Sequence, residues 1–219
     1  MQGPSHLALS WFLADASGLE RPRERRIIAW AGFAPDVDVA AYLGAIVWYR
    51  GDKDLAFENV WKVVHHVYTH NFVFVAVVGA LAWGLARGDR RSRLRVAGFA
   101  MLACALHNFL DLVGGGPTWS IYPLWPASGF PWSVPWSWTI GEWPNVVVLV
   151  ACLAGTLAYA RAAGRSPLEC FGDRADRWLV AVVRQGSVRS SGRTRWAIWA
   201  AVLVVTVAIL APLGFNPFR

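Results

Sequence analysis

The chain has 219 residues, of which 56% are hydrophobic and 16% are charged, and its mean hydropathy is positive. Soluble domains usually carry about 25% charged residues, so this composition excludes an ordinary soluble protein and predicts lipid as the solvent. A net charge of +7 would suggest nucleic acid as the partner of a soluble protein. Here the basic residues lie between long apolar runs, where they set membrane topology, and nucleic-acid binding is the less favoured alternative.

The N-terminal region contains two short apolar runs, residues 7–14 and 27–35, separated by the basic sequence RPRERR at 21–26. A bilayer core about 30 Å thick needs ~20 helical residues, so neither run can cross it alone. We expect a helical hairpin packed against the bundle, or two half-inserted helices. Residues 40–49 predict a further short apolar helix.

Four later segments are long enough, or nearly so, to cross the bilayer: 66–87, 94–113, 144–163 and 196–214. The sequence therefore predicts an all-α, polytopic integral membrane helix bundle. We expect a single domain over 1–219, with a metal-site core at about 5–143 and C-terminal spans at about 144–214. The last two spans are joined by a basic loop, 164–195, in which 173–184 is amphipathic and could lie on the membrane surface.

Seventeen of the nineteen arginines fall in three clusters, at 21–26, 87–95 and 161–195. If successive helices alternate in direction, all three clusters lie on one side of the membrane. The positive-inside rule makes that side cytoplasmic. The expected location is thus a bacterial-type inner membrane, with the lipid bilayer as the first partner.

The segment 114–143, on the opposite and therefore exoplasmic side, holds six of the fourteen tryptophans and five prolines. Prolines at this density exclude a regular helix. Tryptophan favours the headgroup level of the bilayer, where its apolar ring and its N–H group are both accommodated. The segment is interpreted as an interfacial loop, or alternatively as a lid or substrate rim over a site.

All five histidines lie at the end of the predicted bundle away from the arginines, as do three aspartates: His6, His65, His66, His70, His107, Asp36, Asp38 and Asp111. This convergence follows from alternating helix direction. Ionisable residues near the end of a membrane helix are costly and are usually functional. Imidazole nitrogen and carboxylate oxygen are both ligands of divalent transition metals, so the sequence predicts a metal site at this end.

Two of the motifs have helical spacing. HNFLD places His107 and Asp111 four residues apart, on one helix face. In HHVYTHN, His66 and His70 share a face if the helix is continuous. His65 and His70 come together instead if a helix starts near Thr69, which would be its N-cap.

PDVD places Asp36 and Asp38 two residues apart, and in an extended turn both carboxylates would point the same way. Such a pair could bridge two metal ions, or hold one metal and a water; two solvated loop aspartates are the simpler alternative. Glu142, on the same side, is a candidate ligand or general base, or an interfacial anion. His6 stands at the start of the first apolar run.

In their order, an N-terminal histidine, PDVD, HHVYTH and HNFLDLVGGG followed by a proline-rich stretch resemble a known family over roughly residues 5–125. The chain resembles the LexA-binding, inner-membrane-associated, metal-dependent hydrolases, whose pattern runs from a histidine through PDxD and HRGxTHS to HxxxD. This chain departs from the pattern in having His66 and Val67 in place of Arg-Gly, and Asn71 in place of the serine.

The resemblance implies seven metal ligands: His6, Asp36, Asp38, His65, His70, His107 and Asp111. It favours His65 over His66 as a ligand, whereas a continuous helix favours His66. His66 and Glu142 are then the candidates for catalytic acid–base work. The set of ligands is also similar to that of zinc-dependent phospholipases C, which contain an HxxxD motif.

Together these features predict a membrane hydrolase that uses one or two divalent metal ions, zinc first, on a lipid-like or amphipathic substrate such as a phosphodiester. The alternative is a non-enzymatic membrane protein with a structural or sensory metal that acts through partners of its basic loops. Metal transport is less favoured, because the last two predicted spans lack polar residues. The sequence does not determine the oligomeric state.

Overall fold

The computed structural model describes residues 1–184 and divides into two compact units, Met1–Trp138 and Thr139–Arg219. Each unit is described by itself. The described residues are helical apart from turns, loops and one isolated antiparallel bridge between Ile121 and Trp132. The prediction of an all-α protein is therefore confirmed.

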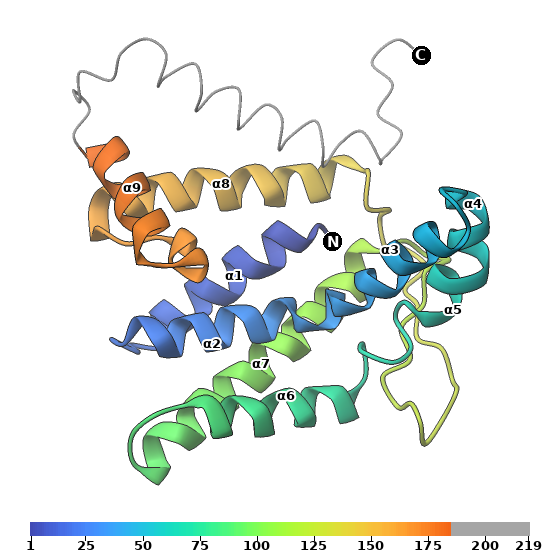
Figure 1. Ribbon diagram of the computed structural model, residues 1–219, viewed down its shortest axis with the longest axis horizontal. Coiled ribbons are helices and arrows are strands. Elements are labelled where there is room, and N and C mark those ends of the chain that lie inside the picture. Colours follow the sequence, from blue (N-terminus) through green and yellow to red (C-terminus); the bar gives the residue numbers. More distant parts are fainter. Residues whose placement is uncertain (185–219) are drawn as a thin grey trace, which may run out of the picture. The chain divides into compact units, whose positions relative to one another are not determined.

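The first unit opens with a hairpin of α1 (Gly3–Ala16) and α2 (Pro22–Phe33), which pack against each other (Figure 1). Arg25 closes the hairpin from inside. Its buried guanidinium donates to the carbonyl oxygens of Leu19 at 2.8 Å and of Glu20 at 2.7 Å. Both predicted N-terminal runs thus become helices longer than their apolar stretches, and α2 packs against α7 as the first of the two expected arrangements requires.

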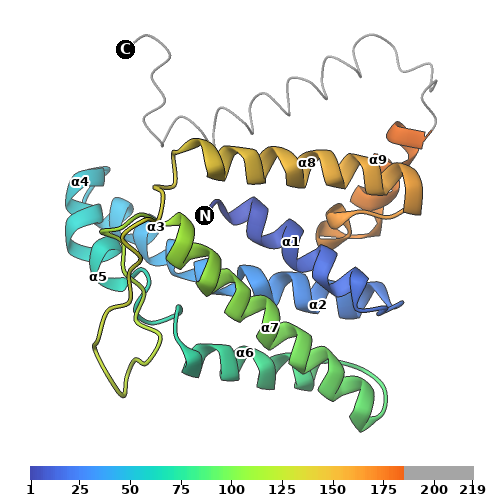
Figure 2. The same ribbon diagram turned by 180° about the vertical axis from the view of Figure 1, so that it is seen from behind.

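The longest of the described helices, α7 (Arg90–Gly114), runs the length of the first unit, with α6 (Phe72–Leu85) beside it (Figure 2). Asp89 caps α7 by accepting a hydrogen bond from the Ser92 amide at 2.8 Å. The buried core lies between α1, α2, α6 and α7. It is built from small and β-branched residues such as Val78, Val96 and Ala100.

Several short elements fill the sequence between α2 and α6: η1 (Ala34–Asp38), α3 (Val39–Trp48), α4 (Lys53–Ala56), η2 (Phe57–Trp61) and α5 (Lys62–Val64). The predicted short helix at 40–49 corresponds to α3. Residues 65–71 then form an irregular loop, and the side chain of Asn71 caps α6 by accepting from the Phe74 amide at 2.8 Å.

The second unit begins with α8 (Trp143–Ala163), followed by η3 (Pro167–Phe171) and α9 (Asp173–Arg184). Helix α8 ends at Gly164, whose φ of +72° is a left-handed conformation that glycine adopts without strain. The predicted amphipathic segment 173–184 is the helix α9, with Leu179 buried and Trp178 half exposed.

Two described helices are long and apolar enough to be candidate membrane spans, namely α7 with 25 residues and α8 with 21. They correspond to the predicted spans 94–113 and 144–163. The predicted span 66–87 is shorter than expected, because the helix starts only at Phe72 and its 14 residues extend about 21 Å. The predicted span 196–214 lies outside the described residues.

Candidate metal centre

The HxxxD pair of α7 faces the inside of the first unit, as its spacing predicts. His107 Nε2 lies 3.1 Å from Asp111 Oδ2. The other ring nitrogen of His107, Nδ1, donates to the carbonyl oxygen of Gly32 at 2.8 Å. Because a carbonyl oxygen can only accept, the imidazole proton sits on Nδ1, and Nε2 presents a lone pair to the cluster.

Helix α1 brings His6 to the same carboxylate. Its Nε2 lies 3.0 Å from Asp111 Oδ1, and its ring stacks on that of His107 with 3.7 Å between the ring centroids. The α-amino group of Met1 also contacts Asp111. The side chain of His6 is thus buried against both members of the α7 pair.

The two aspartates of PDVD lie on η1, a 3₁₀ helix, and the expected extended turn is wrong. With three residues per turn, positions two apart point in different directions. Asp36 Oδ1 lies 3.6 Å from His107 Nε2. Asp38 instead accepts from His65 Nδ1, which lies 3.0 Å from both of its oxygens. The two carboxylates therefore serve different histidines.

The three histidines of the 65–71 loop converge without a helix, so neither predicted arrangement holds: α5 ends before His65, and the cap of α6 is Asn71, not Thr69. His66 has a φ of +68°, a left-handed conformation that is uncommon for a residue with a Cβ atom. The resulting turn directs His66 Nε2 to within 3.6 Å of Asp111 Oδ2, while His65 faces Asp38.

Thr69 connects Asp38 to His70. Its hydroxyl donates to Asp38 Oδ2 at 3.0 Å and lies 3.1 Å from His70 Nδ1. Since the single hydroxyl proton goes to the carboxylate, His70 Nδ1 must be the donor to Thr69, and His70 Nε2 carries the lone pair. That nitrogen lies 3.2 Å from His107 Nε2 and 3.3 Å from Asp111 Oδ2.

These separations fit a bound cation. Two imidazole lone pairs that face each other at 3.2 Å repel unless a positive charge lies between them. Zinc–nitrogen bonds of 2.0–2.1 Å in a tetrahedron place neighbouring ligand atoms about 3.3 Å apart. The ligand atoms of Asp36, His70, His107 and Asp111 all lie within 4.8 Å of one another. A second group that could hold an ion, His65, His66 and His70, shares His70 with the first.

Burial sets the protonation of the groups at the edge of this cluster. It lowers the pKa of His6 to about 4, although Asp111 opposes the shift, so the imidazole is neutral. Burial also raises the pKa of Asp36 to about 6, although His107 opposes the shift. Neutral imidazole is the form that binds metal, and a carboxylate that is costly to charge in isolation gains most from a cation beside it.

Aromatic side chains cover the histidine loop. The ring of Trp61 stacks on His65 with 3.9 Å between the centroids, and the ring of Trp119 lies 5.9 Å from those of both His65 and His66. The amide of Tyr122 donates to the carbonyl oxygen of His66 at 3.2 Å. The tryptophan-rich segment thus lies against the site within the first unit. Of the two interpretations of this segment, a substrate rim is therefore favoured and a plain interfacial loop is not.

Glu142 belongs to the second unit. It is exposed at the start of α8, and its carboxylate accepts from the Thr139 hydroxyl at 3.0 Å. Its catalytic role stays a prediction from the sequence. The roles of Gly32 and Thr69 were not predicted from the sequence: Thr69 was expected only as a helix N-cap, although the family motif contains a threonine at its position.

Fold and site together define an α-helical protein with two candidate membrane spans and a buried His/Asp cluster that could hold a metal ion. The chain belongs to the YdjM inner membrane protein family, whose model matches residues 1–215. This is the family of LexA-binding, metal-dependent hydrolases that the motifs resemble. Among curated proteins and among solved structures, none matches the chain.

Proposed function

We propose that the protein is a membrane-bound hydrolase that depends on a divalent metal, zinc first, and cleaves a lipid-like or amphipathic phosphodiester near the bilayer interface. The observation that carries the proposal is the spacing of three donor atoms, His70 Nε2, His107 Nε2 and Asp111 Oδ2, which lie 3.1–3.3 Å apart. Nitrogen and carboxylate oxygen at such distances are the ligand set of hydrolytic zinc.

Five residues would hold the first ion: His6, Asp36, His70, His107 and Asp111. When bound, such an ion lowers the pKa of a coordinated water to ~7 and makes it nucleophilic. His65 would contribute to a second ion, with Asp38 fixing its ring through Nδ1. The chain thereby supplies rigid, pre-oriented donors from three helices and one loop.

His66 is the proposed acid–base residue. Its Nε2 lies 3.6 Å from Asp111 Oδ2, and its buried Nδ1 has no hydrogen-bond partner within the described residues. An imidazole with an unengaged nitrogen beside the ligands can accept the proton that a nucleophilic water loses, and can return it to the leaving oxygen.

The surroundings of the cluster support a lipid-like or amphipathic substrate. Trp61 and Trp119 flank His65, and the exposed apolar helix α3 directly follows Asp38. Trp48 and Val47 on α3 are 82% and 79% exposed, which suits contact with acyl chains rather than with water. A lipid-like substrate matches this arrangement, because its polar headgroup would lie at the metal site and its apolar tail against the exposed apolar side chains.

Elemental analysis of the purified chain tests the metal, and phospholipid and phosphodiester hydrolysis with and without chelator tests the chemistry. We expect one or two zinc ions per chain and hydrolysis that chelator abolishes and added zinc restores. Metal without hydrolysis of any phosphodiester would refute the enzyme. Metal-free protein that retains its fold would refute the site itself.

A structural or sensory metal is the second candidate, and the depth of the cluster favours it. His6, His70 and His107 are each at most 1% exposed. A structural zinc is closed by four protein ligands, whereas a catalytic one keeps a position open. In that case, removing the metal would lower the melting temperature sharply, and no hydrolysis would accompany it.

Orientation is part of the proposal: the arginine clusters face the cytoplasm and the metal site faces the exoplasmic side. A cysteine placed at Ser128 should react with an impermeant thiol reagent added from outside, whereas one at Ser92 should not. Both serines are partly exposed in the described chain, so labelling at each position reports which side of the membrane it faces. The reverse pattern would invert the topology and leave the metal site intact.

A further inference from the structure

A groove of about 430 Å³ lies between α2 and α6, and none of the residues that line it belongs to the His/Asp cluster. Its floor contains the buried residues Ala31, Val78 and Ala82, and its walls carry the exposed side chains of Trp30 and Leu81. Alanines in the floor leave space between the two helices that larger residues would fill. The groove is therefore a preformed apolar slot on the outside of the first unit.

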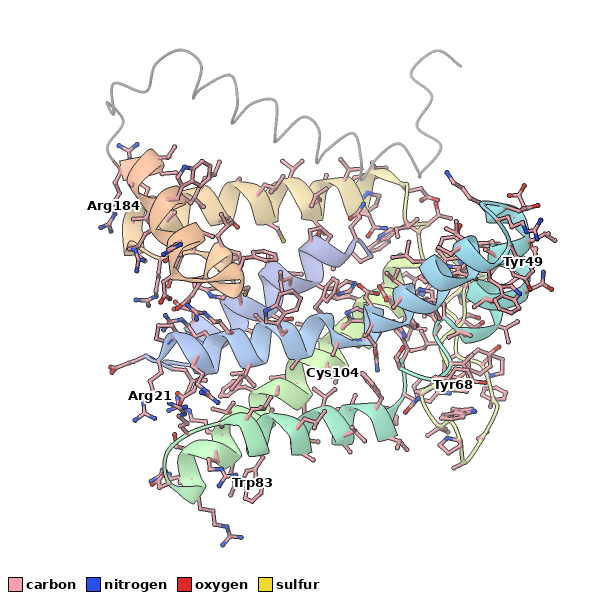
Figure 3. All side chains as sticks on the ribbon, in the orientation of Figure 1. Arg21, Tyr49, Tyr68, Trp83, Cys104 and Arg184 are labelled. Carbon is pink, nitrogen blue, oxygen red and sulfur yellow. The ribbon has the colours of Figure 1, made fainter. Side chains whose placement is uncertain are left out.

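One end of the groove is basic. Arg23 and Arg26 line it there, at the end of the unit where Figure 3 labels Arg21 and Trp83. Arg23 Nη2 donates to the carbonyl oxygen of Leu85 at 2.9 Å, which fixes the guanidinium between the ends of α2 and α6. Within residues 1–184 no carboxylate forms an ion pair with Arg23. A guanidinium has five N–H donors, so further donors remain for an anion.

The length of the groove matches one bilayer leaflet. From Arg23 to Ala34 the helical rise is about 16 Å at 1.5 Å per residue. Half of a hydrocarbon core about 30 Å thick is ~15 Å. A lipid whose phosphate is at the arginines would thus have its acyl chain along the whole apolar slot.

We propose that this groove binds one anionic phospholipid, with its phosphate at Arg23 and Arg26 and one acyl chain between α2 and α6. Arginine matches phosphate oxygens bidentately, and basic pockets between membrane helices recognise acidic headgroups in this way. The site is separate from the metal centre, so it holds whether or not the protein is a hydrolase.

Native mass spectrometry of the full-length chain in detergent tests the proposal, with phosphatidylglycerol, phosphatidylcholine of the same acyl chains, and glycerophosphoglycerol, which has no acyl chains. We expect one tightly held phosphatidylglycerol per chain and weaker binding of the other two probes. Equal binding of phosphatidylcholine would refute the role of charge. Equal binding of glycerophosphoglycerol would show an anion site without a lipid slot and would also overturn the proposal.

The variant Arg23→Ala/Arg26→Ala should weaken phosphatidylglycerol binding about 30-fold, the equivalent of about 1 kcal/mol for each arginine. The matched control Arg90→Ala/Arg91→Ala removes the same charge from exposed positions at the start of α7 and should leave the affinity unchanged. An equal loss in both variants would mean unspecific attraction and would refute the site.

A second pair of variants tests the slot without touching the arginines. Leu81→Ser places a hydroxyl on the groove wall and should weaken binding, whereas Leu102→Ser changes a comparably exposed leucine of α7 that does not line the groove and should not. Loss of binding in Leu102→Ser but not in Leu81→Ser would show that the lipid binds another surface and would refute the groove as its site.

Discussion

The α7 pair and the 65–71 loop contribute to the same cluster by different physical means. His107 and Asp111 come together because four residues make one helical turn, and their side chains meet at 3.1 Å. The loop histidines meet the cluster through an irregular segment in which His66 adopts a φ of +68°. The first arrangement is local and repeats in any helix, whereas the second depends on the contacts that hold the loop.

Hydrogen bonds from two other segments of the chain hold the loop. Asp38 holds His65 and Thr69, and the amide of Tyr122 binds the His66 carbonyl oxygen. Since a left-handed non-glycine residue costs about 1–3 kcal/mol, such contacts must offset the strain. We therefore expect the His107–Asp111 pair to keep its geometry when the 65–71 loop is altered, whereas the loop should lose its geometry when its supporting contacts are removed.

Asp111→Asn should have the largest effect, because it removes the charge that His6, His66, His70 and His107 all face. We expect the metal content of the purified protein to fall to background in elemental analysis. Asp54→Asn, at an exposed aspartate of α4, is the control and should bind metal fully. Full metal content in Asp111→Asn would show that the Asp111 carboxylate is not a ligand.

His65→Ala and His66→Ala separate the two roles within the loop. Within the second group that could hold an ion, the family pattern assigns His65 and not His66 as a ligand, so we expect His65→Ala to reduce the metal content by one ion in a two-ion site. His66→Ala should retain the metal but lose hydrolysis, because it removes the proposed proton acceptor. Elemental analysis and a phosphodiester assay measure both. If His66→Ala loses the metal and His65→Ala does not, the ligand assignment carried over from the family is wrong by one residue.

The sequence predicted the α7 pair and the gathering of the histidines, because helical period and alternating helix direction are read from residue spacing. It did not predict the geometry of PDVD or of the loop. A 3₁₀ turn at Asp36 and a positive φ at His66 have no pattern in the residues themselves. Both conformations depend on tertiary contacts, such as the hydrogen bond from Thr69 to Asp38, between residues that are distant in the sequence. Residue spacing alone therefore does not predict them.

A substitution of Thr69 should have a smaller effect, because it removes one contact that supports the loop and no proposed ligand. Thr69→Val keeps the shape but removes the hydroxyl that links His70 to Asp38, so His70 loses the partner that holds its tautomer. Loss of such an outer partner typically costs 10–100-fold in metal affinity, and we expect that loss in a competition titration with a zinc chelator. Thr69→Ser keeps the hydroxyl and should retain most of the affinity. Equal zinc affinity in the two variants would show that the Thr69 hydroxyl does not orient His70.

Gly32 supports the cluster from the helix side, because it lets α1, α2 and α7 approach closely enough for its carbonyl oxygen to reach His107. A Cβ atom at Gly32 would lie 1.8 Å from Ser10 Oγ and 2.5 Å from Ser10 Cβ, and Ser10 is buried. The Cβ atom of Ser10 cannot rotate away, so the two helices must separate. A Cβ atom at Gly79 of α6 would lie 2.4 Å from the flexible side chain of Met101, which is 40% exposed, and at an ordinary contact distance of 3.8 Å from the Ala97 carbonyl oxygen.

Gly32→Ala should therefore destabilise the protein by about 1–3 kcal/mol, the usual cost of overpacking. In Gly79→Ala, Met101 can move aside, and the higher helix propensity of alanine, worth up to about 1 kcal/mol, offsets the remaining cost. Thermal unfolding in detergent measures both variants. Because separating the helices also draws the carbonyl oxygen away from His107, Gly32→Ala should bind zinc more weakly than Gly79→Ala. A larger loss of stability in Gly79→Ala would contradict the close three-helix approach, and unchanged zinc affinity in a destabilised Gly32→Ala would show that the Gly32 carbonyl does not orient the ligand.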